Sequence, residues 1–324
     1  MSFKFLNIDL SQLEFESCLG SGCYGGSVCL YRNRKDKRNR RIVVKSIPYN
    51  SPEYAYETVT KEHTILSQVN HPRILRYFGF FQTNDSWNMI TEFAEWGNLA
   101  EFLHRRKQQG AFLTQRVVMA KYRDMAEALQ YLHQRKVIHR DLKPGNVLID
   151  ADNRLKLADF GIAKICTNVS LDEEMNMTIV GTPLFMAPEV ASGKRYDYKS
   201  DVWPLGVIFY ELCMLEHPFV ERFIECEESM ERKKFSPPQI DCARHGFSRD
   251  MQTLCEMMIQ VEPKQRWTLE KILKDECVVG LMEREMLQLL KKWLLEMSPV
   301  SYYSLLKKLT TVETKCREFC FCIL

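Results

Sequence analysis

The stretch "VIHRDLKPGNVLID", residues 137–150, most constrains how this chain can fold. Apolar residues at both ends indicate burial, whereas the middle carries charged and polar side chains: His139, Arg140, Asp141, Lys143 and Asn146. Removing an ion from water costs several kcal/mol unless a partner offsets that cost. The fold must therefore either expose the middle as a loop or surround it with partners as a site.

Length and composition indicate a folded globular protein. With 324 residues, 45% of them hydrophobic, the chain can form two domains or one bilobed unit. Its 45 basic and 42 acidic residues leave a net charge of +3, which is too small to indicate nucleic-acid or membrane binding. We therefore expect no nucleic-acid partner.

The sequence contains no signal for secretion or membrane insertion. Polar residues interrupt the first stretch, and no segment approaches the roughly 18 to 20 apolar residues of a transmembrane helix. The 12 cysteines include no C-x-x-C pair, which favours reduced thiols over disulfides or a zinc site. We expect a cytoplasmic protein with no transmembrane segment; a nuclear location is the alternative.

The spacing of apolar residues changes near residue 98. Before it, short apolar runs between turn residues predict an antiparallel sheet, interrupted by one helix at "EYAYETVTKEHTILSQV". After it, helical spacing occurs in "NLAEFLHRR", "TQRVVMAKYRDMAEALQYLHQ" and "SDVWPLGVIFYELCML". The predicted fold class is α+β, with a small antiparallel β lobe containing one main helix and a larger, mainly helical lobe.

Two features of the predicted small lobe favour phosphate binding. Gly20, Gly22 and Gly25 in "LGSGCYGGSV" allow backbone N–H groups to approach a phosphate, although similar glycines also form ordinary turns. Lys45 ends the strand "IVVK", and Glu62 lies on the apolar face of the next helix. This pair either staples strand to helix or holds the lysine against nucleotide phosphates.

The charged middle of residues 137–150 fits a site for phosphoryl transfer. Asp141 can accept a proton from an attacking hydroxyl, Lys143 can neutralise the transferring group, and Asn146 can bind a metal through its amide oxygen. Asp159, in "KLADFGIAK", adds a carboxylate. One amide and one carboxylate form a sparse oxygen site, which suits Mg²⁺ when water and ATP phosphates complete its coordination.

Taken together, these motifs resemble those of the eukaryotic protein kinases of the serine/threonine type. The resemblance runs from Phe15 to Leu273 and includes, in the family's order, the glycine loop, Lys45, Glu62, His139-Arg140-Asp141 with Asn146, Asp159-Phe160-Gly161, Ala187-Pro188-Glu189, Asp201 and Arg266. It predicts an N-terminal extension at 1–14, a kinase domain at 15–275 with lobes at about 15–92 and 97–275, and a helical C-terminal extension with a Cys-rich end at 276–324.

The resemblance implies a role for each matching residue. Asp141, Lys143 and Asn146 are expected to be catalytic; Asn146 and Asp159 are expected to bind Mg²⁺, or alternatively Mn²⁺. Thr91 is the expected gatekeeper before the hinge. The expected binding residues for ATP, the co-substrate, are Leu19, Gly20, Gly22, Gly25, Val28, Val43, Lys45, Glu62, Glu92, Ala94 and Leu148.

Other matching residues are expected to support the fold of the site. The resemblance implies that His139 supports the catalytic loop and that Asp201 braces it from a central helix. Arg266 is expected to pair with Glu189 in the large lobe.

Two phrases concern the substrate. "LKPGN" and "GTPLFMAPE" resemble the serine/threonine pattern more than that of the tyrosine kinases, and the "APE" segment favours a protein substrate over a small molecule. With "DFGIAK", they are also loosely similar to mitotic and never-in-mitosis-related kinases, which leaves the subfamily open.

The activation segment, residues 159–189, offers a candidate phosphosite. The resemblance favours Thr178 over Thr182, because the family's counterpart of Thr182 packs toward the catalytic aspartate. Arg140 and Lys164 are the candidate pocket for that phosphate, and an upstream activating kinase is an expected partner. An ordinary exposed threonine is the alternative interpretation of Thr178.

Three residues depart from the family pattern without removing a catalytic group. Ser27 occupies the expected valine position unless an insertion moves Val28 there, and Val43 replaces a small alanine above the adenine. Pro204 falls inside a predicted helix, which it is expected to bend or shift. The alternative function is a pseudokinase or scaffold module with weak or no phosphoryl transfer.

Two further segments each allow two interpretations. The basic run at residues 32–41 is a solvated hairpin tip or a nuclear-import or nucleic-acid patch. The apolar stripe in "EREMLQLLKKWLLEM" packs on its own domain or binds a partner. The end, "KCREFCFCIL", lacks the cysteine of a prenylation box, and palmitoylation there stays open.

Overall fold

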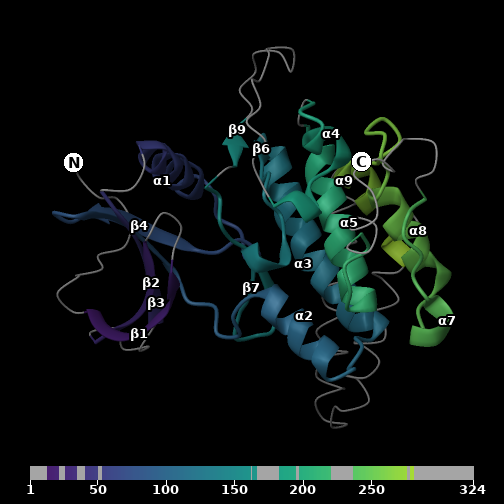
Figure 1. Ribbon diagram of the computed structural model, residues 1–324, viewed down its shortest axis with the longest axis horizontal. Helices are drawn as coiled ribbons and strands as arrows, with labels where there is room; N and C mark the ends of the chain where they lie inside the picture. The colour runs from purple at the N-terminus through teal and green to yellow at the C-terminus, as the bar shows by residue number, and fades with distance from the viewer. Residues whose placement is uncertain are drawn as a thin grey trace, which may run out of the picture. The chain divides into compact units, whose positions relative to one another are not determined.

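The computed structural model describes residues 13–21, 26–34, 41–49, 53–161, 163–165, 182–194, 197–219, 236–275 and 278–280. The chain divides into two compact units, Met1–Asp275 and Glu276–Leu324. The elements discussed below belong to the first unit, and most of them are labelled in Figure 1. The predicted C-terminal extension lies outside the described residues except for 278–280.

The small lobe is built on a five-stranded antiparallel sheet (Figure 1). Its strand order is β1-β2-β3-β5-β4. Helix α1 is inserted between β3 and β4 in the sequence, and β4 then occupies the edge next to β5. The bounds are β1 (Leu13–Ser21), β2 (Ser27–Asn33), β3 (Arg41–Pro48), α1 (Glu53–Leu66), β4 (Tyr77–Gln82) and β5 (Ser86–Glu92).

Strand β3 contributes to hydrophobic clusters on both faces of this sheet, because successive side chains of a strand alternate between faces. Ile42 and Val44 belong to one cluster. Ile47 belongs to the other, together with Val59 of α1. Helix α1 therefore covers the face of the sheet that also carries Lys45.

The large lobe is organised around helix α5 (Lys199–Met214), which is buried on every side from Ser200 to Tyr210. A helix that is apolar all round belongs in a protein interior. Helices α3 and α8 pack against it, as Figure 1 shows. The other α-helices among the described residues of this lobe are α2 (Leu99–Gln108), α3 (Gln115–Gln134), α4 (Pro188–Ala191), α7 (Cys242–His245), α8 (Arg249–Met258) and α9 (Leu269–Lys274).

Short strand pairs position the loops that carry the charged residues. Strand β6 (Val137–Ile138) pairs with β9 (Lys164–Ile165), and β7 (Val147–Ile149) pairs with β8 (Leu155–Leu157). The segment between β6 and β7 contains the 3-10 turn η3 (Pro144–Asn146). Residues 139–146 and 158–161 therefore form two neighbouring loops at the ends of these pairs.

The predicted α+β class with two lobes is confirmed by this arrangement. The predicted strand "ILRYFGFF" is shorter than expected, since β4 begins at Tyr77. Ile74 instead forms an isolated parallel bridge with Leu157 of β8, in which Leu75 N–H donates to the Leu157 carbonyl and the Arg73 carbonyl accepts from Leu157 N–H. Helix α5 continues through Pro204 to Met214. Within the described ranges, no helix is both long enough and apolar enough to cross a membrane.

Replacing Gly206 by alanine tests the close packing of α5 against α8. A Cβ at this position would lie 2.7 Å from both Ile259 Cγ1 and Met258 Cβ. Without crowding, alanine stabilises a helix by up to about 1 kcal/mol relative to glycine. Because overpacking outweighs that gain, we expect Gly206→Ala to lower the free energy of unfolding by about 2 kcal/mol in urea denaturation.

Gly79→Ala in β4 is the control, since nothing lies within 4 Å of its added Cβ. A Gly206→Ala protein as stable as the unsubstituted chain would contradict the close contact.

Candidate functional site

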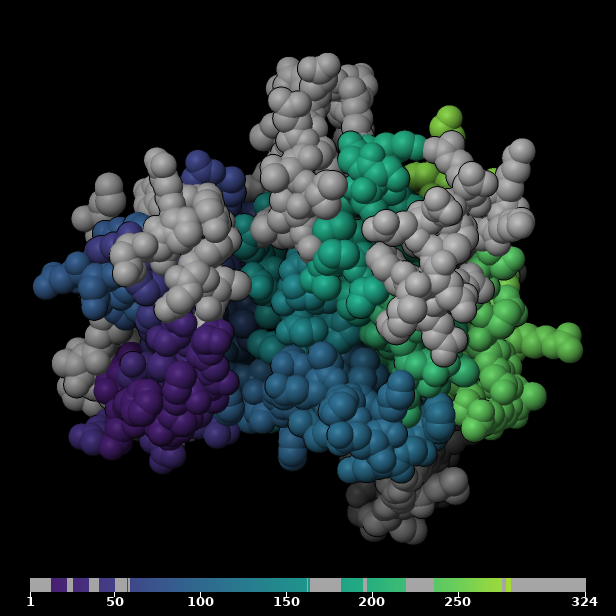
Figure 2. Space-filling view, viewed as in Figure 1, coloured from purple at the N-terminus to yellow at the C-terminus, as the bar shows by residue number. Residues whose placement is uncertain are grey.

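A pocket of about 620 Å³ lies between the small-lobe sheet and the loops after β6 and β8. In Figure 2 the surface is hollowed between the purple strands and the blue-green large lobe. Most of the predicted ATP-binding residues line this pocket, whereas Gly22 and Gly25 lie outside the described residues. The lining ones are Leu19, Gly20, Val28, Val43, Lys45, Glu62, Glu92, Ala94 and Leu148.

The alignment of the glycine loop, left open by the sequence, can be read from the strand register. Val28 pairs with Gly20 on one side and Lys45 on the other, and it lines the pocket. Ser27 is not among the lining residues. The register therefore favours Val28 over Ser27 for the expected valine position. Val43 and Thr91 also line the pocket.

Lys45 and Glu62 form an ion pair at the inner end of this pocket. Lys45 Nζ lies 3.0 Å from Glu62 Oε2 and 3.9 Å from Asp159 Oδ1. The Glu62 side chain is almost completely buried, so its charge requires a cation as partner. The pair fixes the lysine ammonium between helix α1 and the loop that carries Asp159.

The hinge after β5 presents a backbone donor to the pocket. Glu92 N–H is already bonded to the Arg76 carbonyl at 2.9 Å, and the Glu92 carboxylate accepts from Lys156 at 2.8 Å. Ala94 is buried, and its N–H has no hydrogen-bond acceptor among the described residues. Because a buried N–H requires a partner, Ala94 is the more suitable donor to a nucleobase.

Three side chains hold the Asp141 carboxylate in one orientation. Its Oδ2 accepts from Lys143 Nζ at 2.7 Å and from Asn146 Nδ2 at 2.9 Å. Its Oδ1 accepts from the Thr182 hydroxyl at 3.2 Å, and Lys143 Nζ also donates to this hydroxyl at 2.7 Å. The three predicted catalytic residues are thus within hydrogen-bond reach of one another.

Asn146 and Asp159 offer oxygen atoms to the same pocket. The Asn146 amide nitrogen donates to the Asp141 backbone carbonyl at 2.8 Å as well as to its carboxylate, so the amide oxygen faces the opposite way. Both Asn146 and Asp159 line the pocket. An amide and a carboxylate oxygen fit Mg²⁺, which keeps waters and substrate phosphates as its other ligands.

Asp201 of the central helix α5 anchors the catalytic loop. Its carboxylate accepts from the backbone N–H of His139 at 2.9 Å and of Arg140 at 3.0 Å. Arg140 has a φ of 71°, a left-handed conformation that is unfavourable for arginine and requires such support. His139 is fully buried, with Nε2 3.2 Å from the Ala158 carbonyl oxygen.

His133, on α3, also contacts Asp201 but was not predicted from the sequence. Its Nε2 lies 2.9 Å from Asp201 Oδ2. Burial raises the pKa of the Asp201 carboxyl, but the His133 hydrogen bond and the field of the two nearby histidines outweigh this effect, so that the pKa lies below its ordinary value. A histidine near the end of a helical pattern carries no sequence signal for this contact.

The structure describes the predicted fold-supporting pair in full and the predicted phosphate pocket only in part. Arg266 is fully buried and binds Glu189 through two hydrogen bonds, of 2.7 and 2.9 Å. Lys164 pairs with Ile138 in the β6-β9 ladder. Because Ile138 precedes Arg140 by two residues, the backbones of Lys164 and Arg140 lie near each other. Thr178 lies outside the described residues.

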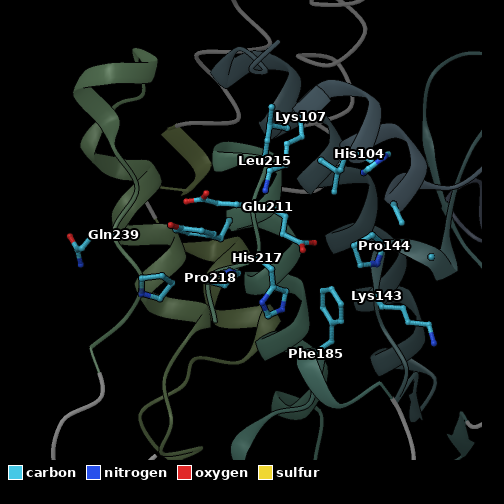
Figure 3. Close-up of a pocket in the computed structure, with 16 residues that line it drawn as sticks. His104, Lys107, Lys143, Pro144, Phe185, Glu211, Leu215, His217, Pro218 and Gln239 are labelled. Carbon is cyan, nitrogen blue, oxygen red and sulfur yellow. The ribbon is translucent and has the colours of Figure 1, made fainter. Parts of the chain in front are cut away.

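A second pocket, of about 640 Å³, lies beside the catalytic loop (Figure 3). Its lining includes Lys143 of that loop, Lys107 of α2 and Glu211 of α5. Glu211 Oε2 is buried and has no hydrogen-bond partner among the described residues. Burial raises the pKa of this carboxyl to about 8, although Lys107 partly opposes the shift. The sequence did not reveal this pocket.

A lysine held by a buried glutamate, a hydrogen-bonded aspartate and two oxygen-bearing side chains close to one pocket are the groups that a nucleotide-dependent phosphotransferase requires. The match to the protein kinase domain family spans residues 13–278. The chain belongs to this family, and the predicted resemblance is confirmed.

Relatives that are similar to this chain include serine/threonine kinases of two groups. Human "Serine/threonine-protein kinase Nek5" is 30% identical over 278 residues, covering 85% of this chain and 37% of the relative. Human "Serine/threonine-protein kinase Nek2" is 30% identical, with 82% and 60% covered. "Serine/threonine-protein kinase ULK3" of Xenopus laevis is 34% identical, with 76% and 51% covered. The matched region is thus between about a third and three fifths of each relative.

Asp201→Asn should weaken the attachment of the catalytic loop. The amide cannot accept all the hydrogen bonds that the carboxylate accepts, and its NH₂ group faces other donors. We expect a loss of about 3 kcal/mol in the free energy of unfolding at neutral pH, measured by urea denaturation. Asp152→Asn, in an exposed turn, is the control and should change little.

The difference in the free energy of unfolding between the unsubstituted chain and Asp201→Asn should depend on pH. Because the folded-state pKa of Asp201 lies below the ordinary value of 3.8, its contribution is fully present above that value. It is lost as pH falls through the folded-state pKa. The stability gap between the two proteins should therefore narrow in acid, and a gap that widens there would rule out the carboxylate as its source.

Proposed function

We propose that this chain is an ATP-dependent protein kinase that transfers the γ-phosphate of ATP to serine and threonine hydroxyls of proteins. The observation that carries the proposal is the orientation of the Asp141 carboxylate by Lys143 and Asn146. Asn146 lines the nucleotide pocket and Lys143 lines the second pocket, so the carboxylate has one hydrogen-bond partner from each lining. The named activities of the relatives support the same conclusion.

The chain's own residues suffice for positioning and proton transfer. Asp141 accepts the proton of the attacking hydroxyl, and Lys143 neutralises charge on the transferring group. Lys45, held by Glu62 at 3.0 Å, grips the phosphates. Asn146 and Asp159 would hold Mg²⁺ or Mn²⁺, and the bound ion would neutralise the charge on the ATP phosphates.

The proposed nucleotide site uses both lobes. Leu19, Val28, Val43 and Leu148 enclose the adenine, and the Ala94 backbone hydrogen-bonds to it. This proposal is supported by their shared position on one pocket of about 620 Å³.

Serine or threonine as the acceptor is supported by the contact between Thr182 and the catalytic residues. The Thr182 hydroxyl binds both Lys143 and Asp141. This contact fits the expectation that Thr182 packs toward the catalytic aspartate, and it keeps Thr178 as the proposed phosphosite.

We further propose that phosphorylation of the activation segment by an upstream kinase regulates the chain. A phosphate on Thr178 would pair with Arg140 and Lys164, and such charge-assisted bonds order a loop. The backbone proximity of Lys164 and Arg140 supports this proposal. The proposed location is the cytoplasm, with the nucleus as the alternative.

At the described positions, the basic run at residues 32–41 fits the interpretation as a solvated hairpin tip. Arg34 binds Glu14 through two hydrogen bonds, of 2.6 and 3.0 Å, and Arg41 lies over the Phe93 ring at 4.5 Å. We therefore propose no nucleic-acid partner. A partner for the apolar stripe after residue 280 remains a proposal from the sequence.

Asp141→Asn is the direct test of the proposed reaction. Loss of the base should lower kcat at least about 100-fold. The measurement is transfer of labelled phosphate from ATP and Mg²⁺ to mixed proteins and to the chain itself, followed by phosphoamino acid analysis. Phosphoserine or phosphothreonine that disappears in the variant would support the proposal.

Nucleotide binding provides the control, because Asp141→Asn should leave ATP affinity nearly unchanged in a thermal-shift assay. Undiminished transfer by the variant would exclude Asp141 as the base. No transfer by either protein, with no ATP binding, would favour the pseudokinase or scaffold alternative.

We also propose that the second pocket receives a basic side chain of the protein substrate. Lys143 of the catalytic loop lines this pocket, so a substrate side chain bound there would lie close to the substrate hydroxyl that reacts. The unpaired buried oxygen of Glu211 would gain a charge-assisted hydrogen bond from a guanidinium. Lys107 lowers the pKa of Glu211 only in part, because the pKa still lies at about 8, so Lys107 does not replace that partner.

Glu211→Gln tests this pocket with two peptides that differ only by arginine or alanine near the phosphoacceptor. We expect KM for the arginine peptide to rise roughly tenfold, and KM for the alanine peptide and for ATP to change little. Arginine preference should also increase as pH rises through about 8, because the Glu211 carboxyl must ionise to pair.

Glu216→Gln is the matched control, since Glu216 lines the same pocket but is exposed. Equal KM changes for both peptides, or the same effect from Glu216→Gln, would refute a Glu211 subsite.

A further inference from the structure

Two cysteines face each other across the first two strands of the sheet. Cys18 of β1 is the direct antiparallel partner of Cys29 of β2. Opposite residues in such a ladder project from the same face, with Cα atoms about 4.5 or 5.5 Å apart. Both spacings fall within the range of about 4.4–6.8 Å that a disulfide spans. Besides burial, the Cys18 thiol also raises the pKa of the Cys29 thiol, which agrees with their opposite positions in the ladder.

The two thiols differ in accessibility. Cys18 is exposed, and its Sγ donates to the Gly20 carbonyl at 3.5 Å and the Val28 carbonyl at 3.7 Å. Cys29 is half-buried, and burial raises the pKa of its thiol. An oxidant from solvent therefore meets Cys18 first, while Cys29 is placed to react with the oxidised sulfur.

The pair is directly connected to the nucleotide pocket. Leu19 and Gly20, immediately after Cys18, line that pocket, as does Val28, immediately before Cys29. The strand register also shifts between Cys18 and Gly20. A covalent link between β1 and β2 at this point therefore constrains residues that lie against the nucleotide.

We propose that Cys18 and Cys29 form a reversible disulfide when hydrogen peroxide is present, and that this bond weakens nucleotide binding. The Cys18 thiolate attacks a peroxide oxygen, giving a sulfenic acid and, after protonation, one water. The Cys29 sulfur then attacks the Cys18 sulfur, which forms the S–S bond and releases a second water. The two sulfurs together lose two electrons, which reduce the peroxide.

The bond is tested on the full chain by mass spectrometry after peroxide treatment, blocking of free thiols and digestion without reduction. Chymotrypsin suits this mapping because it cleaves after Leu19 and Tyr24, which separates Cys18, Cys23 and Cys29. We expect a fragment linking Cys18 to Cys29 that dithiothreitol resolves. Its retention in a Cys23→Ser variant excludes a rearranged pairing.

The consequence is tested by binding of a fluorescent ATP analogue, which does not depend on phosphoryl transfer. Oxidation should raise the dissociation constant roughly three- to tenfold, because the crosslink displaces Leu19, Gly20 and Val28 from the nucleotide that they contact in the proposed pocket. Reduction should restore it. Cys18→Ser and Cys29→Ser should bind normally and lose the response to peroxide.

Two results would overturn the proposal. One is oxidation of Cys18 without a link to Cys29. The other is a link that forms while nucleotide affinity stays unchanged. The inference builds on the proposed nucleotide pocket but not on catalysis, so a chain that binds ATP without transferring phosphate would still give a decisive answer.

Discussion

The hydrogen bonds to Asp201 are the constraint on which the rest of the site depends. They join the backbone of the catalytic loop to helix α5, whose residues from Ser200 to Tyr210 are all buried. Arg140 is held at a φ of 71°, and the loop then turns so that Asp141 and Lys143 meet. A loop without this anchor would relax toward more favourable dihedrals and separate these groups. The buried carboxylate thus fixes the geometry of the loop, and removing it would leave the loop's buried N–H groups without an acceptor.

The Glu189–Arg266 pair gives a second example of the same principle. Arg266 is fully buried, and besides Glu189 it binds the carbonyl groups of Lys199 and Gln260. Ser200 adds a hydrogen bond of 3.1 Å to Glu189. Because the start of α5 takes part in this network, helix α4 and the N-terminal end of α5 are fixed together. The same helix thus carries both the anchor of the catalytic loop and a link to the end of the activation segment.

Much of the fold and the candidate site could be predicted from local sequence. Asp141, Lys143 and Asn146 lie within five residues of each other, so that their proximity follows from one loop. Lys45 and Glu62 could be paired because strand alternation and helical spacing place both on facing surfaces. By contrast, Glu211 looks like any acid in a helix, and only tertiary packing buries its carboxylate. The Cys18–Cys29 contact depends on a strand register that two bulges shift, which spacing alone does not give.

The proposed nucleotide pocket is lined both by loops of the large lobe and by strands of the small lobe, and this division has a functional consequence. Asn146 and Asp159 belong to loops held by the helical core, whereas Leu19 and Val28 belong to β1 and β2. A change in β1 or β2 therefore alters how the nucleotide is gripped while Asp141, Lys143 and Asn146 keep their mutual hydrogen bonds. In the proposed reaction, nucleotide affinity and phosphoryl transfer therefore depend on different parts of the fold: β1 and β2 line the nucleotide pocket, and the anchor at Asp201 holds the loop that carries Asp141.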